Sequence, residues 1–154
     1  MKMDKENFEK YLKERYYPQI EWYDKKANLN HKWYNILQWG LIILSALTPV
    51  LIAVNFGFPE SKFLRWTPII SSVIVAILAA SLKTFKFQEN WINYRTTCET
   101  LKKEIYFYRA GIYDYAVSEN KEATFVERVE NLISRENTLW LSLHKEAEKG
   151  NNHA

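Results

Sequence analysis

Charged and apolar positions are strongly segregated along this chain of 154 residues. Two blocks, residues 36–54 and 66–82, contain no charged side chain, whereas the remainder is dense in Lys, Glu, Tyr and Trp. As helices, blocks of 19 and 17 residues are about 28 and 26 Å long, close to the ~30 Å hydrocarbon core of a bilayer. The pattern therefore predicts two membrane-spanning helices, at about 36–54 and 66–82.

The composition of the two blocks favours a membrane over the alternative, a pair of buried helices in a soluble bundle. A helix in a soluble bundle would carry a polar stripe on its outer surface, but the polar side chains here are mostly short hydroxyls. Aromatic rings such as Trp33 and Trp39 lie at one end of the first block, and Phe85 and Trp91 follow the second. This placement is typical of the aromatic belts at membrane interfaces.

The connection between the blocks, NFGFPESK at 55–62, is short and rich in turn residues. It predicts adjacent, antiparallel spans with both termini on one side. Basic residues number six near the terminal side (Lys25, Lys26, Lys32, Lys83, Lys86 and Arg95) and two near the turn (Lys62 and Arg65). The positive-inside rule then predicts a multi-pass protein of the cell membrane with both termini in the cytoplasm. The polar N-terminal sequence predicts no cleavable signal peptide.

Apolar residues continue outside the blocks at alternating intervals of four and three, a heptad seam typical of packed helices. The first seam consists of Tyr16, Ile20, Tyr23, Ala27, Asn30, Tyr34, Leu37 and Leu41. The second consists of Phe87, Trp91, Tyr94, Cys98, Leu101, Ile105, Tyr108, Ile112 and Tyr115. The second seam predicts one helix from the membrane to about residue 116. The pattern leaves open whether the seams pack within one chain or between chains.

These patterns predict an all-α, homo-oligomeric membrane protein: a two-transmembrane helical hairpin with long cytoplasmic helical extensions. The expected segments are N-terminal helices at 1–32, the hairpin at 33–85, a stalk with a C-terminal helix at 86–150, and a frayed tail at 151–154. Pro18 is expected to divide the N-terminal helix. Residues 118–121 are expected to form a turn, and Thr124 with Glu127 to cap the last helix.

The sequence carries no pattern for catalysis or cofactor binding. Nucleotide-binding, zinc-protease and C-x-x-C motifs are absent, the three histidines are far apart, and Cys98 is the only cysteine. A net charge of +3 is too small to indicate nucleic acid. We therefore expect no enzyme activity, no cofactor, no metal and no nucleic-acid partner. The expected partners are the lipid bilayer, small ions and further copies of the chain.

Two segments flanking the hairpin resemble a known family. ERYYPQIEWYDKKANLNHKWYN precedes the first block, and NWINYRTTCETLKKEIYFYRAGIYDY follows the second. The pairing, and above all the string Y-R-T-x-x-E-x-L-K-x-E from Tyr94 to Glu104, resembles the SLATT family, the two-transmembrane domains associated with SMODS and SLOG proteins. The resemblance covers roughly residues 10–145. It implies a pore-forming membrane effector of the kind tied to nucleotide-triggered bacterial defence, although no motif here supports a nucleotide second messenger as ligand.

Two spans per chain cannot enclose water, so a pore requires several copies around an axis. The candidate pore or gate residues are Ser45, Thr48, Pro49, Thr67, Ser71, Leu78 and Ser81, and the candidate outer mouth is Asn55 and Glu60. Pro49 should kink the first span and free the carbonyl of Ser45. The alternative is that the small residues only pack the spans together and that the proline is a tolerated kink.

The candidate stalk clamp consists of Arg95, Glu99 and Glu104. Arg95 and Glu99 are four residues apart and so share a helix face; alternatively, Arg95 reaches Glu21 or Asp24 of the first helix. The function predicted from all these features is a homo-oligomeric, ion-conducting channel or effector pore. The alternative is a membrane-anchored helical scaffold that binds a cytoplasmic partner.

Overall fold

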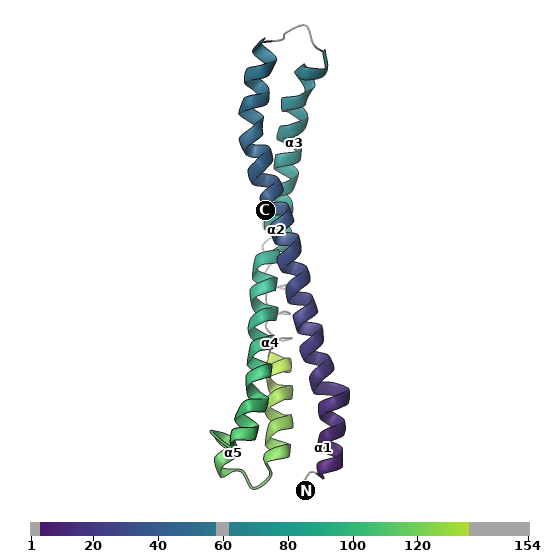
Figure 1. Cartoon of the computed structure of the whole chain (residues 1–154), viewed down its shortest axis with the longest axis vertical. Coiled ribbons are helices and arrows are strands. Elements are labelled where there is room, and N and C mark those ends of the chain that lie inside the picture. Colours follow the sequence, from purple (N-terminus) through teal and green to yellow (C-terminus); the bar gives the residue numbers. More distant parts are fainter. Residues whose placement is uncertain (1–3, 58–61, 136–154) are drawn as a thin grey trace, which may run out of the picture. The chain divides into compact units, whose positions relative to one another are not determined.

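The computed structural model describes residues 4–57 and 62–135, and every regular element in these ranges is a helix (Figure 1). The chain divides into two compact units. We call Met1–Lys25 with Asn93–Ala154 the core unit, and Lys26–Ile92 the hairpin unit. Two long helices contribute to both: α2 (Tyr17–Gly57) and α4 (Phe87–Ala110).

The hairpin unit pairs the second half of α2 with α3 (Lys62–Phe85), and the two run antiparallel side by side (Figure 1). The predicted blocks 36–54 and 66–82 lie wholly inside these helices, and both helices are long and apolar enough to cross a membrane. Only 0% and 11% of their most apolar stretches is buried within the chain. A core helix of a soluble bundle would be mostly buried, so these helices do not form the core of this chain's own fold.

The prediction of one helix from the second block to about residue 116 is wrong. The helix is interrupted at Lys86, whose φ of 47° lies in the left-handed region, and α4 begins at Phe87. Asn90 stabilises the junction, because its side-chain Nδ2 donates to the carbonyl of Phe85 at 3.2 Å and its N–H donates to the carbonyl of Lys86 at 3.0 Å.

The far end of α4 also comes earlier than the seam indicated. The helix ends at Ala110 and is followed by Gly111 at φ 64°, a left-handed conformation that glycine adopts without the steric cost of a Cβ. A short helix, α5 (Asp114–Val117), follows. Tyr115 is buried as the seam predicted, whereas Ile112, which lies in the turn after α4, is exposed.

Pro18 does not divide the N-terminal helix. The chain instead passes from α1 (Lys5–Tyr11) through a π-helix, η1 (Leu12–Tyr16), into α2. Proline has no N–H to offer to the preceding turn, and the wider π turns just before it accommodate this loss without ending the helix.

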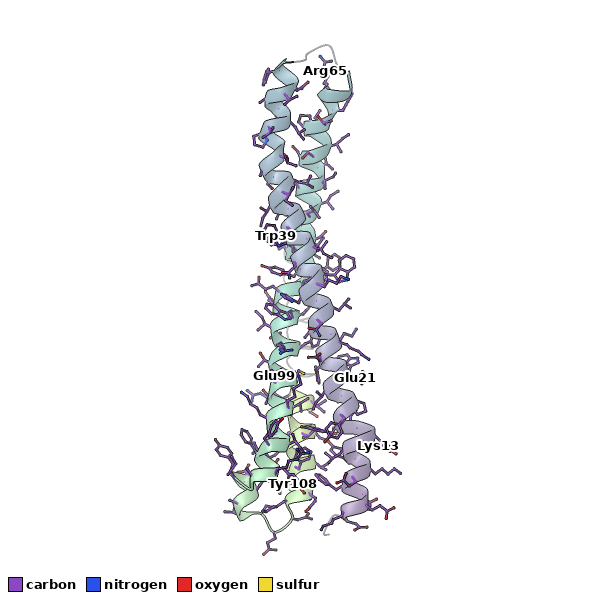
Figure 2. All side chains as sticks on the ribbon, viewed as in Figure 1. Lys13, Glu21, Trp39, Arg65, Glu99 and Tyr108 are labelled. Carbon is purple, nitrogen blue, oxygen red and sulfur yellow. The ribbon has the colours of Figure 1, made fainter. Side chains whose placement is uncertain are left out.

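The core unit is built around aromatic side chains from α1, η1, α2, α4, α5 and a helix over 121–135. Its buried apolar residues are Phe8, Leu12, Tyr16, Tyr23, Cys98, Leu101, Ile105, Tyr115, Phe125, Val129 and Ile133. Phe8 lies against Tyr108 and Phe125, with ring centroids 5.1 and 5.5 Å apart, and Figure 2 shows Tyr108 among these helices. In this unit the seams therefore pack within one chain.

The helix over 121–135 follows the predicted turn, but its cap differs from the prediction. Asn120, not Thr124, precedes the helix, and its Oδ1 accepts from the N–H of Ala123 at 3.2 Å. Thr124 lies inside the first turn and donates to the carbonyl of Asn120, so the capping box of Thr124 with Glu127 is wrong. The end of the predicted C-terminal helix and the tail at 151–154 lie outside the described residues.

Candidate functional site

A pair of hydroxyls joins the two apolar helices of the hairpin unit. Thr48 Oγ1 of α2 lies 2.9 Å from Ser71 Oγ of α3, and Thr48 also donates to the carbonyl of Leu44 at 2.7 Å. Since the single hydroxyl proton of Thr48 goes to Leu44, Ser71 is the donor to Thr48. Ser71 is 5% exposed. The pair thus holds α2 against α3, with both hydroxyl protons engaged.

Three more of the predicted pore residues lie on α3. Leu78 is half-buried beside Gly40, where an added Cβ would lie 3.5 Å from Leu78 Cδ1. Thr67 is half-buried as well. Ser81 donates its hydroxyl to the carbonyl of Ile77 at 2.8 Å. Ser71 and Leu78, predicted to face a pore axis, therefore face the partner helix of the same chain.

The remaining predicted pore residues lie elsewhere. Ser45 and Pro49 are exposed on the outer surface of α2, and Asn55 is half-buried near the end of that helix. Glu60 lies outside the described residues. The predicted pore residues therefore fall into two groups, one at the contact between α2 and α3 and one on the outer surface of the hairpin. Helical spacing alone did not separate these groups.

The predicted stalk clamp lies in the core unit. Arg95 contacts two carboxylates: Nη1 lies 3.1 Å from Asp24 Oδ1 and Nη2 lies 3.1 Å from Glu99 Oε1. Lys102 joins the cluster at 3.4 Å from Glu99 and 3.7 Å from Asp24. Glu21 pairs instead with Lys25 on its own helix, and Figure 2 shows Glu21 and Glu99 on their respective helices. Because these side chains are about half exposed, each ion pair contributes little stability.

Glu104, the third predicted clamp residue, has a different environment. It is 2% exposed and accepts hydrogen bonds from the hydroxyl of Tyr115 at 2.5 Å and from the guanidinium of Arg128. Arg128 also binds Asp114 of α5. Glu104 therefore ties α4 to α5 and to the helix over 121–135. Sequence reasoning missed these partners; the available signal was a glutamate beside Ile105 in the most apolar part of the seam.

A second link fastens the helix over 121–135 to the N-terminal segment. Arg15 binds Glu130 through two hydrogen bonds, Nε to Oε1 at 3.1 Å and Nη2 to Oε2 at 3.2 Å, and Tyr11 donates to the same carboxylate at 2.9 Å. The hydrogen bonds from Arg15 hold the pKa of Glu130 below its usual value. This link connects side chains more than one hundred residues apart, and no local pattern indicated it.

Four tyrosines make the stability of the core unit sensitive to alkali. Burial raises the pKa values of Tyr11, Tyr16 and Tyr115, and burial together with a hydrogen bond to Glu122 raises the pKa of Tyr108 to about 12. A raised pKa in the folded state stabilises the fold below the unfolded tyrosine pKa of about 10, and this stabilisation is lost as the pH rises through the folded value.

We therefore expect the core unit to lose helical structure as the pH rises above about 10. Far-ultraviolet circular dichroism and phenolate absorbance, recorded together, should show helix loss coupled to late tyrosine ionisation. Tyr108→Phe removes one of these phenols and should reduce the alkaline loss, with Tyr106→Phe as the exposed control. Ionisation of all ten tyrosines near pH 10 with no change in helicity would contradict the expectation.

Within the described residues, no group of three His, Cys, Asp or Glu side chains is placed to hold a metal ion. Searches of curated proteins and of solved structures found no match to the chain. Residues 18–123 match the family described as "Protein of unknown function (DUF4231)". This range begins in α2, includes the whole hairpin unit and α4, and ends in the helix over 121–135. Because the match covers more than half of the sequence, the chain belongs to the DUF4231 family.

Proposed function

We propose that this protein is inserted in the cell membrane by its hairpin unit and that several copies assemble into a pore for small ions. The observation that carries the proposal is the exposed apolar surface of α2 and α3: in the most apolar stretch of each, only 0% and 11% of the residues are buried within the chain. A bilayer covers such a surface. Two helices cannot enclose water, so conduction requires further copies around an axis.

The outer face of α2 around Ser45 is the best-supported candidate for the pore wall. Pro49 has no N–H to donate to the carbonyl of Ser45. In a single copy of the chain, the side chains of both residues are exposed. An unsatisfied carbonyl facing lipid costs several kcal/mol. Water in a pore, or a donor from a neighbouring copy, removes this cost, so we place the face with Ser45 and Pro49 toward the axis rather than toward lipid.

The resemblance of the segment Tyr94–Glu104 to SLATT domains supports the same function, since that family is associated with pore-forming effectors. The alternative is a membrane-anchored scaffold. One observation favours it: apolar side chains at the corner of α4 and α5 are strongly exposed, namely Tyr106, Ile112, Tyr113 and Val117. Such a patch suits a protein partner.

Flux through protein in liposomes tests the proposal. We expect the purified parent protein to pass small ions, and Ile42→Ser to raise the flux several-fold, because Ile42 lies one turn from Ser45 and a hydroxyl there favours water over a dry constriction. Leu47→Ser is the matched control. Leu47 is as exposed as Ile42, 46% against 47%, but it lies on the opposite side of α2 from Ser45, and it should leave the flux unchanged.

Folded, oligomeric protein that passes neither Na⁺, K⁺ nor Cl⁻, in the parent or in Ile42→Ser, would favour the scaffold. An equal rise in flux for Leu47→Ser would place the water path elsewhere on the hairpin.

We further propose that both termini are cytoplasmic, as the distribution of basic residues indicates. In a Cys98→Ser background, a cysteine replacing Gly57 should react with an impermeant maleimide on intact cells. Gly57 ends α2, and an added Cβ there meets no other atom within 4 Å. A cysteine replacing the exposed Glu127 should react only after lysis. The reverse pattern of labelling would invert the orientation.

A further inference from the structure

The hairpin unit contains a groove where α3 gives way to α4. Its apolar lining includes Leu41 of α2 and Ala79 and Leu82 of α3. Polar side chains also line it, among them Lys83 and Lys86. Every residue that lines the groove belongs to the hairpin unit. The groove therefore combines an apolar surface with cationic groups at one place on the chain.

The groove carries an excess of positive charge. Lys86 is partly neutralised, because its Nζ lies 3.5 Å from Glu89 Oε2. Lys83 makes no ion pair or hydrogen bond within the part of the chain that the structure describes. Two lysines thus face one carboxylate, and the groove is complementary to a ligand with a single negative charge.

The position of Lys83 indicates the kind of anion. It directly follows residues 66–82, the uncharged stretch of α3, so in a membrane its ammonium would lie at the level of the lipid phosphates. Ala79, which also lines the groove, lies one helical turn closer to the middle of the hairpin. A free phosphate ion would satisfy Lys83 but would leave the apolar lining uncovered, whereas a phospholipid supplies both an anion and an alkyl chain.

We propose that this groove is a binding site for an anionic phospholipid, with the phosphate at Lys83 and Lys86 and the start of an acyl chain along Leu41, Ala79 and Leu82. The inference rests on the proposed insertion of the hairpin unit in a membrane. It does not depend on conduction. Basic pockets between membrane helices on the cytoplasmic side are a known setting for anionic head groups.

Native mass spectrometry of the full chain in detergent tests the site. Phosphatidylglycerol and phosphatidylcholine with identical acyl chains are added in equal amounts, and the lipid retained by the protein is counted. We expect the parent to retain phosphatidylglycerol preferentially, and Lys83→Gln to weaken this retention about fivefold, as one cation at a lipid surface contributes. Lys32→Gln removes the same charge from an exposed position outside the groove and should leave retention unchanged.

Filling the groove provides a test that leaves both lysines in place. Ala79→Leu should reduce retention of phosphatidylglycerol, whereas Ala80→Leu, at an exposed position that does not line the groove, should not. Circular dichroism should show unchanged helicity for both variants. Inorganic phosphate added in excess should fail to displace the lipid, and displacement would mean that the groove binds the phosphate ion alone and would overturn the proposal.

Equal weakening of phosphatidylglycerol retention by Lys83→Gln and Lys32→Gln would mean that the lipid is attracted diffusely to the protein surface, and would also overturn the proposed site.

Failure of the lipid-site proposal can be distinguished from failure of the pore proposal. If the protein discriminates between the lipids through Lys83 but passes no ions, the lipid site is supported and the pore is contradicted. If the protein passes ions but shows no lipid preference, the pore is supported and the lipid site is contradicted. If the protein stays soluble without detergent and does not float with vesicles, both the pore and the lipid site are contradicted.

Discussion

Arg128→Met is expected to destabilise the core unit more than any other single substitution of a charged residue there. Glu104 is 2% exposed, and Arg128 is the cation that neutralises it. Without that guanidinium, the carboxylate stays buried, and within the described residues the hydroxyl of Tyr115 is its remaining hydrogen-bond donor. Breaking a buried ion pair by removing one member costs about 3–5 kcal/mol. The loss of the contact with the exposed Asp114 adds little.

Denaturant unfolding of the full chain in detergent, followed by circular dichroism, measures this cost as a lower midpoint for the core unit. Arg135→Met is the control, because Arg135 is exposed on the same helix. The double variant Glu104→Leu with Arg128→Met removes both charges and should recover most of the stability, since an apolar pair in place of a buried ion pair is often neutral. An Arg128→Met midpoint equal to that of Arg135→Met would show that Glu104 does not depend on Arg128.

Leu101→Asp is expected to have the second-largest effect. Leu101 is fully buried in the core of the core unit, and its carbonyl accepts a hydrogen bond from the hydroxyl of Tyr16 at 2.6 Å. A carboxylate at this position would be enclosed by apolar side chains of the core cluster, and burial of an unpaired charge costs several kcal/mol. We expect the core unit to unfold while α3 and the part of α2 in the hairpin unit keep their helical structure, because Leu101 belongs to the core unit and not to the hairpin unit.

Limited proteolysis of protein in membranes measures both parts of this expectation: cleavage within 93–135 should accelerate, while the protein remains in the membrane fraction. Tyr106→Asp is the matched control. Tyr106 lies on the same helix but is 65% exposed, so its replacement should change stability by less than about 0.5 kcal/mol. A Leu101→Asp protein whose core unit stays intact but whose oligomer dissociates would show that this seam packs between chains instead.

Much of the helical architecture was determined by the sequence alone, because it depends on local spacing. Uncharged blocks predicted the apolar parts of α2 and α3, and intervals of three and four predicted the buried positions Tyr16, Tyr23, Leu101 and Ile105. A helix brings residues three and four apart onto one face regardless of what packs against it. The buried face can therefore be predicted before the partner is known.

Only the tertiary structure decided what each face meets. Ser71 and Leu78 carry the same spacing whether they face a pore axis or α2, and the contact of Ser71 with Thr48 at 2.9 Å distinguishes the two. Glu104 was predicted as a clamp residue, yet Arg128, 24 residues away, supplies its charge partner. The interruption at Lys86 leaves the heptad spacing unchanged, so no periodic pattern could indicate it. Such contacts join residues distant in sequence, and their energies depend on burial and geometry that exist only after the helices have packed.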